Sequence, residues 1–159
     1  MKQSCKLGGN AFRKELIQVL KLKIPTPYFN QLSEYWTIMD NETIRMLSES
    51  KLVTIGSHGY YHNNLGEISF EEAKKELVAS KEYLENLIQK EVNELAYPDG
   101  SYTRAVVDYA KSMGFTKQLA VDYLFVDDER DSCIEKRFGI NPYITFEDQL
   151  ISILKGSYY

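Results

Sequence analysis

The stretch LVTIGSHGYYHNN, residues 52–64, places a short apolar and β-branched run directly before both histidines of the chain. Charged residues precede the run and Gly56 ends it, which is the pattern of a buried strand. His58 and His62 then follow the predicted carboxyl end of that strand. Since functional residues of α/β folds gather at the carboxyl ends of strands, we expect a site here.

Helical and strand-like segments alternate on both sides of this stretch. Ser69 begins SFEE, a capping box, and an apolar stripe then predicts a helix of about five turns. Asp40 and Asn10 are predicted N-caps of two further helices, which end near Ser50 and Lys21. Further strands are predicted at 92–97, 118–121, 123–126 and 139–144, and further helices at 103–113 and 146–154.

This alternation predicts βα units around a parallel sheet that is either open or curled into a partial barrel. The chain has 159 residues, enough to bury a core without staples. No repeat, low-complexity tract or linker divides it, so we expect one domain over residues 1–159.

Composition excludes several classes of partner. The net charge is −4 and the pI is about 5.3, which argues against nucleic acid and anionic membranes. No apolar run approaches the roughly 20 residues of a membrane span. The N-terminus lacks the apolar core of a signal peptide, so a cytoplasmic location is the default expectation. Cys5 and Cys133 stand in no redox or metal spacing and are expected to be free thiols.

His58 and His62 are the only two histidines of the chain. On a helical turn, side chains four residues apart have Cβ atoms about 5 to 6 Å from each other. Two imidazole nitrogens at that separation can share one divalent cation. The alternative is one surface histidine and one core histidine with satisfied hydrogen bonds.

A second motif, LAYPDGSY at residues 95–102, also follows a predicted strand. Taken alone, its YPDG segment is an ordinary β-turn, with proline at the second position and glycine at the fourth. Its meaning depends on the histidine motif that precedes it.

Together, TIGSHGYYHNNL (54–65) and LAYPDGSY resemble the second and third motifs of the polysaccharide deacetylases, the NodB-homology proteins. In that family the histidine motif follows a strand and binds zinc or a related metal. The later motif resembles the family variant that reads AYPYG, with Asp99 in the place of its second tyrosine. Weaker matches, RFGIN at 137–141 and MDNETI at 39–44, extend the resemblance to about residues 30–142.

The resemblance implies a distorted (β/α) barrel of the NodB type and a metal-dependent hydrolase that removes acetyl groups from an N- or O-acetylated carbohydrate. His58 and His62 would bind the metal, with zinc expected first and nickel or cobalt as alternatives. The backbone N–H of Asp99 would stabilise the oxyanion, with Tyr97 and Pro98 beside it in the same wall of the groove.

For two catalytic roles of the family, the sequence offers no matching residue. Its first motif supplies two adjacent aspartates, a general base and a third metal ligand, yet no such pair precedes residue 30. We therefore expect a partial barrel that lacks its first strand. The family's general acid is a late histidine, and none follows His62. Asp127 and Asp128 could replace the acids but are more simply a solvated turn.

These gaps leave a second interpretation open, in which the chain is a catalytically inactive sugar-binding or interaction module. A barrel without its first strand also exposes a parallel edge. A homo-oligomer that covers this edge is therefore expected.

Overall fold

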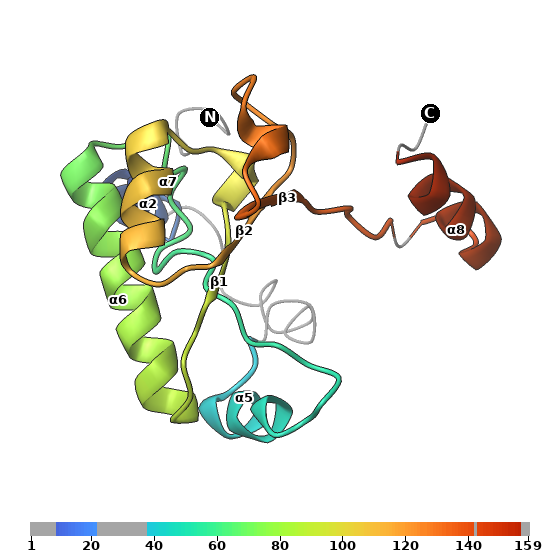
Figure 1. Cartoon of the computed structure of the whole chain (residues 1–159). Helices are drawn as coiled ribbons and strands as arrows, with labels where there is room; N and C mark the ends of the chain where they lie inside the picture. The colour runs from blue at the N-terminus through green and yellow to red at the C-terminus, as the bar shows by residue number, and fades with distance from the viewer. Residues whose placement is uncertain (1–8, 22–37, 142, 157–159) are drawn as a thin grey trace.

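The computed structural model describes residues 9–21, 38–141 and 143–156. Helices and strands alternate from α6 to β2, whereas α2 and α5 precede α6 with no strand between them in the described residues (Figure 1). In order, the elements are α2 (Gly9–Lys21), α5 (Asn41–Ser48), α6 (Phe70–Ile88), β1 (Glu94–Ala96), α7 (Arg104–Ser112), β2 (Lys117–Ala120), β3 (Ile134–Lys136) and α8 (Phe146–Lys155), with 3-10 turns at Pro98–Gly100 and Asp128–Arg130.

The three strands form one parallel sheet in the order β1-β2-β3. Parallel neighbours need a crossover, and α7 supplies it between β1 and β2. Figure 1 shows α6 and α7 side by side next to the strands, whereas α8 lies well apart from them. The fully buried apolar side chains come from the sheet, from α6 and α7, and from the loops between them: Leu65, Ala73, Leu77, Val92, Leu95, Tyr97, Val107, Ala110, Phe115 and Ala120.

The predicted N-caps Asp40 and Ser69 are confirmed, whereas Asn10 lies inside α2, which begins at Gly9, and is not a cap. The Asp40 carboxylate accepts a hydrogen bond from Thr43 N at 2.8 Å. Ser69 and Glu72 form the reciprocal capping box at the start of α6, and Thr103 caps α7. Because these bonds satisfy the first free N–H groups of each helix, short polar residues at those positions fix where the helices begin.

Three strand predictions are wrong. Residues 52–56 form no strand, because Leu52 is 96% exposed and only Ser57 reaches the sheet, through a single parallel bridge to Leu95. Residues 123–126 are a loop, since the Asp128 carboxylate binds the N–H groups of Leu124 and Phe125 that a ladder would need. No strand occurs at 139–141 or 143–144, and β3 lies earlier in the chain.

The fold is thus mixed α/β with a small parallel sheet, as expected. The described residues form an open three-stranded sheet, so the partial barrel stays a prediction. Within the same residues, no helix combines the length and the hydropathy of a membrane span. Cys133 is a free thiol, while Cys5 and Pro142 lie outside the described residues.

Candidate functional site

Both histidines lie on the histidine loop, residues 57–63, which leaves the sheet at Ser57. Ser57 N donates to Glu94 O, and Ser57 O accepts from Ala96 N, both at 2.8 Å. His58 Nδ1 lies 2.7 Å from Ala96 O. A carbonyl oxygen only accepts, so Nδ1 carries the hydrogen and Nε2 of the neutral ring keeps its lone pair. Metal-binding histidines are commonly oriented in this way by a backbone carbonyl.

The rings of His58 and His62 meet edge to face, with centroids 4.7 Å apart and planes at 85°. The helical turn assumed from their spacing is absent, because the loop reverses through left-handed backbone at Gly59 (φ 74°) and His62 (φ 55°). A non-glycine residue in that region costs free energy of order 1 kcal/mol or more. Such strain persists only where surrounding contacts hold it.

Electrostatics favours the neutral form of His58. Its partial burial lowers the pKa of the imidazole, and the hydrogen bond to Ala96 O acts in the opposite direction. Arg137 and His62 lower this pKa further, while the Asp99 carboxylate raises it. A lowered pKa keeps the ring in the state that binds metals.

The YPDG turn, residues 97–100, follows β1 directly. Gly100 N donates to Tyr97 O and Ser101 N to Pro98 O, both at 3.0 Å, and Asp99 has a left-handed φ of 52°. Since His58 is bonded to the residue before Tyr97, the fold brings the two sequence motifs together at the carboxyl end of β1. It is a turn, as the simpler interpretation held, but one placed beside the histidines.

Tyr97 and Pro98, the first two residues of this turn, are buried. The Tyr97 ring stacks on Tyr102 with centroids 4.7 Å apart, and its hydroxyl donates to the Gln118 side chain. Burial raises the pKa of Tyr97 far above the usual tyrosine value. The phenol therefore belongs to the core, and Tyr97 can serve the site only through its backbone and its packing.

Arg137 is a site neighbour to which the sequence assigned no role. Its guanidinium donates to Tyr97 O at 3.0 Å, and its backbone N–H continues the sheet by donating to Ala120 O at 2.8 Å. The signal available in the sequence was its place in the RFGIN match, directly after β3. A cation is thereby bound to the first carbonyl of the YPDG turn.

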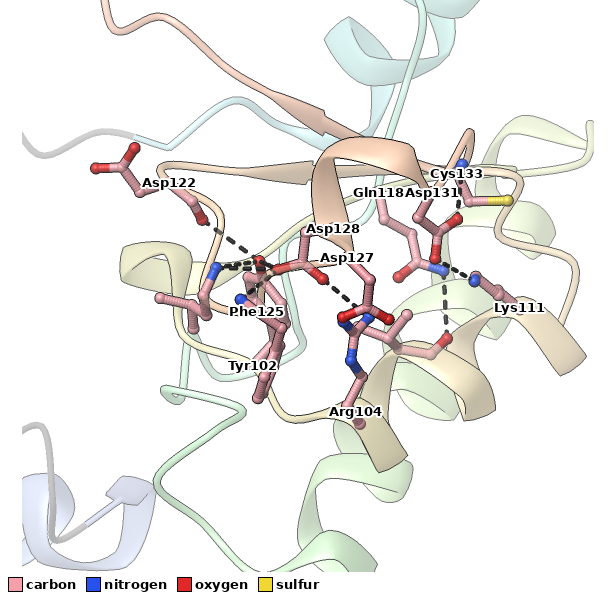
Figure 2. A network of polar contacts seen from close by, with 12 residues as sticks. Tyr102, Arg104, Lys111, Gln118, Asp122, Phe125, Asp127, Asp128, Asp131 and Cys133 are labelled. Atoms are coloured by element: carbon pink, nitrogen blue, oxygen red, sulfur yellow. Dashed lines mark hydrogen bonds and ion pairs between the residues drawn. The ribbon is translucent and has the colours of Figure 1, made fainter.

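Asp127 and Asp128 do not join the histidines. Figure 2 shows Asp128 beside Tyr102 and Arg104, with Asp127 paired to the same arginine. Asp128 is fully buried, so the expectation of a solvated turn is wrong for this residue. Its Oδ1 lies 2.9 Å from Arg104 Nη1, close enough for an ion pair but not aligned as a hydrogen bond. Burial and the Asp128 hydrogen bond raise the pKa of Tyr102 to about 12.

The pair of imidazoles fits part of a metal site. Neutral nitrogen ligands suit zinc, nickel and cobalt, and the second nitrogen of His58 is already oriented. In the part of the chain that the structure describes, no group of three or more His, Cys, Asp or Glu side chains could hold a metal ion. A catalytic zinc usually has three protein ligands, so this pair would be one ligand short of such a site.

The sequence matches the family model described as polysaccharide deacetylase over residues 8–117. No curated protein matches the chain. Among solved structures, it is similar to the Streptococcus pyogenes deacetylase PplD in complex with acetate, with a TM-score of 0.62 and 18% identity, over 76% of this chain and 54% of that one.

A de-N-acetylase from Aggregatibacter actinomycetemcomitans gives a TM-score of 0.53 at 17% identity, over 69% of this chain and 51% of that one. A CE4 family pseudoenzyme from Bacillus anthracis gives 0.46 at 23% identity, over 49% and 27%. The chain thus spans about half the length of the deacetylase structures it matches. These likenesses concern the fold.

Proposed function

Because this chain belongs to the polysaccharide deacetylase family, we propose that it binds a divalent metal ion through His58 and His62 and removes acetyl groups from an N- or O-acetylated carbohydrate. The observation that carries the proposal is the hydrogen bond from His58 Nδ1 to Ala96 O. It points the basic nitrogen of a half-buried imidazole away from the sheet, beside a second imidazole. Zinc is the first candidate, with nickel and cobalt as alternatives.

The chain's own groups have distinct parts in this proposal. When bound, a divalent ion would polarise an acyl carbonyl and lower the pKa of a water. His58 and His62 would hold that ion. The backbone N–H of Asp99 would donate to the acyl oxygen as negative charge develops on it. The buried side chains of Tyr97 and Pro98 would hold this donor in place by anchoring the turn in the core.

A second candidate is a catalytically inactive module that keeps the groove and binds sugar without turnover. It is favoured because, among the described residues, no third His, Cys, Asp or Glu side chain joins the histidines in a group that could hold a metal ion. The sequence also offers no further histidine as general acid. Under this alternative, sugar binding would survive removal of the imidazoles.

The test compares the purified protein with the double variant His58→Ala/His62→Ala. We expect about one zinc, nickel or cobalt ion per chain by elemental analysis, and its loss in the variant. Acetate release from N-acetylglucosamine oligomers and acetylated xylan should depend on the same pair. Metal binding and sugar binding without acetate release would support the inactive module. A protein that neither contains metal nor takes up added metal would retire the catalytic proposal.

A further inference from the structure

A buried carboxylate on α6 holds the histidine loop from inside. Glu76 is only 5% exposed. Its Oε2 accepts the backbone N–H groups of Tyr60 and Tyr61, both at 2.8 Å. Its Oε1 accepts from Asn63 Nδ2 at 2.7 Å. Two of these donors lie between the two histidines, and the third, Asn63, directly follows His62.

Arg13 on α2 binds the same loop, with a positive charge where Glu76 has a negative one. Arg13 Nη2 donates to Tyr61 O at 2.6 Å and to Asn63 Oδ1 at 2.5 Å. Arg13 Nη1 lies 3.3 Å from His62 O and donates to it. Asn63 therefore connects the two charges, because its amide nitrogen faces Glu76 and its amide oxygen faces Arg13.

Burying a carboxylate costs several kcal/mol unless hydrogen bonds compensate for its lost hydration. The compensation here comes from the loop that carries both imidazoles. The loop also contains two left-handed residues, and at Gly59 an added Cβ would lie 3.3 Å from Glu76 Oε2. Contacts of this kind are what a strained backbone requires in order to persist.

We propose that Glu76, Asn63 and Arg13 are positioning residues, which lock the histidine loop in the geometry that brings His58 and His62 to one metal ion. This inference rests on the proposed metal role of the two histidines. Neither Glu76 nor Arg13 is a ligand in it. They act through the backbone of residues 60–62 and through Asn63.

The first test is Glu76→Gln. The new amide turns one of the two acceptors into a donor, which then faces either the loop N–H groups or the Asn63 amide. We expect zinc affinity, measured by competition with a chromophoric chelator, to fall about 10- to 100-fold, the range seen when partners of metal ligands are removed. The absorption bands of bound cobalt should change as well, which reports ligand geometry.

A reciprocal variant tests whether the hydrogen-bond pattern is the cause. In Glu76→Gln/Asn63→Asp the negative charge moves from α6 to the histidine loop. The new amide on α6 can then donate to the new carboxylate on the loop, while its oxygen still accepts from Tyr60 and Tyr61. The new carboxylate also keeps an acceptor for Arg13. We expect most of the lost zinc affinity and the wild-type cobalt spectrum to return. Failure of this rescue in a folded protein would overturn the proposed positioning role of Glu76 and Asn63.

Glu85→Gln is the matched control on the same helix. Glu85 Oε1 accepts from Val92 N at 3.0 Å and pairs with Lys81 at 2.9 Å, away from the loop. Zinc affinity should not change in this variant. If Glu76→Gln does not fold, Arg13→Lys keeps the charge but cannot span three acceptors, and a several-fold loss of zinc affinity at unchanged melting temperature is then expected.

The outcomes separate the two proposals. A wild-type protein that binds no metal refutes the proposed function and, with it, the positioning of the histidines for a metal. A wild-type protein that binds zinc, with unchanged affinity in Glu76→Gln and Arg13→Lys, refutes the positioning role alone.

Discussion

The histidine loop and the loop at 121–128, named here the Asp128 loop, are built around buried carboxylates in the same way. Glu76 accepts two consecutive backbone N–H groups and one side-chain donor, Asn63. Asp128 also accepts two consecutive N–H groups and one side-chain donor, Tyr102. Each carboxylate has an arginine nearby, Arg13 through Asn63 and Arg104 directly.

What the loops present differs. The histidine loop presents two imidazoles at the carboxyl end of β1. The Asp128 loop exposes aliphatic side chains, with Val126 fully exposed and Leu124 half exposed. A buried carboxylate that accepts hydrogen bonds from the N–H groups of a loop thus orders irregular backbone. It does not by itself mark a functional site. The chemistry comes from the residues that the ordered loop displays.

The largest expected effect is that of Asp128→Ala on stability. Removal of this carboxylate takes away the acceptor of the Phe125 N–H and the short hydrogen bond of the Tyr102 hydroxyl, and it leaves Arg104 with the exposed Asp127. Loss of one member of a buried pair typically costs about 3–5 kcal/mol. Urea unfolding followed by circular dichroism should show this loss. The proposed zinc affinity should be the same in the folded variant and the wild type, since the Asp128 loop carries neither proposed ligand.

Asp127→Ala is the matched control. Asp127 pairs with the same arginine, but its side chain is 75% exposed, and such pairs contribute about 0–1 kcal/mol. Equal destabilisation by the two variants would show that burial of Asp128 is not the source of the effect.

The sequence predicted the parts of both regions that depend on local chemistry. Asp40 and Ser69 begin their helices as expected, and of the two candidate caps Ser101 and Thr103 it is Thr103 that begins α7. These caps can be predicted because capping involves residues only three positions apart. The two motifs meet because Ser57 of the first motif bridges to β1, and the second motif begins within β1. Strands at 52–56 and 123–126 were predicted wrongly, since periodicity says nothing about whether a partner strand or a carboxylate takes the N–H groups.

The positioning role of Glu76 was not predicted from the sequence. Its signal was present, for Glu76 lies on the same helical face as Ala73, Leu77 and Ser80, all of them buried. A glutamate within an apolar stripe needs a partner in the core. Which partner it has could not be predicted, because Arg13 and Asn63 are both remote from Glu76 in the sequence and reach it only through the tertiary fold.

A second prediction concerns the contact between the YPDG turn and the first residue of the Asp128 loop. Gly100 has a φ of 69°, and an alanine Cβ there would lie 2.7 Å from Val121 Cβ. Gly100→Ala therefore combines backbone strain with a clash, and we expect a loss of about 2–4 kcal/mol in urea unfolding. Gly114→Ala is the control, since Gly114 has a φ of 87° and open space around it. Its loss should be limited to about 1 kcal/mol.

A third prediction uses the ion pair that follows the Asp128 loop. The hydrogen bond from Lys111 lowers the pKa of Asp131 below 3.8 and, in turn, Asp131 raises the pKa of Lys111 above 10.5. The Asp131 contribution is present above pH 3.8 and is lost as pH falls through its folded-state pKa. The Lys111 contribution is present below pH 10.5 and is lost as pH rises through its own.

Lys111→Met should therefore flatten the stability profile at both ends of the pH range, with a loss of at most about 1 kcal/mol at neutral pH. Urea midpoints at intervals from about pH 2.5 to about pH 11 measure the profile. An unchanged acid limb in the variant would show that the pair does not cause it.

The smallest expected effect on folding concerns the sheet edge from which the histidine loop departs. The Asp128 loop follows β2, which is paired on both sides, whereas the histidine loop begins at Ser57, which is joined to β1 by one bridge. Because exposed edges tend to be covered, we expect the protein to form a homo-oligomer through residues 52–56. Val53→Lys should convert it to a monomer in sedimentation velocity while changing the unfolding free energy per chain by about 0.5 kcal/mol or less.

Lys51→Glu, a charge change beside the same edge, separates a general electrostatic effect from loss of the apolar contact. A wild-type protein that sediments as a monomer at high concentration would show that the histidine loop is held by Glu76 and Arg13 without support from a second chain.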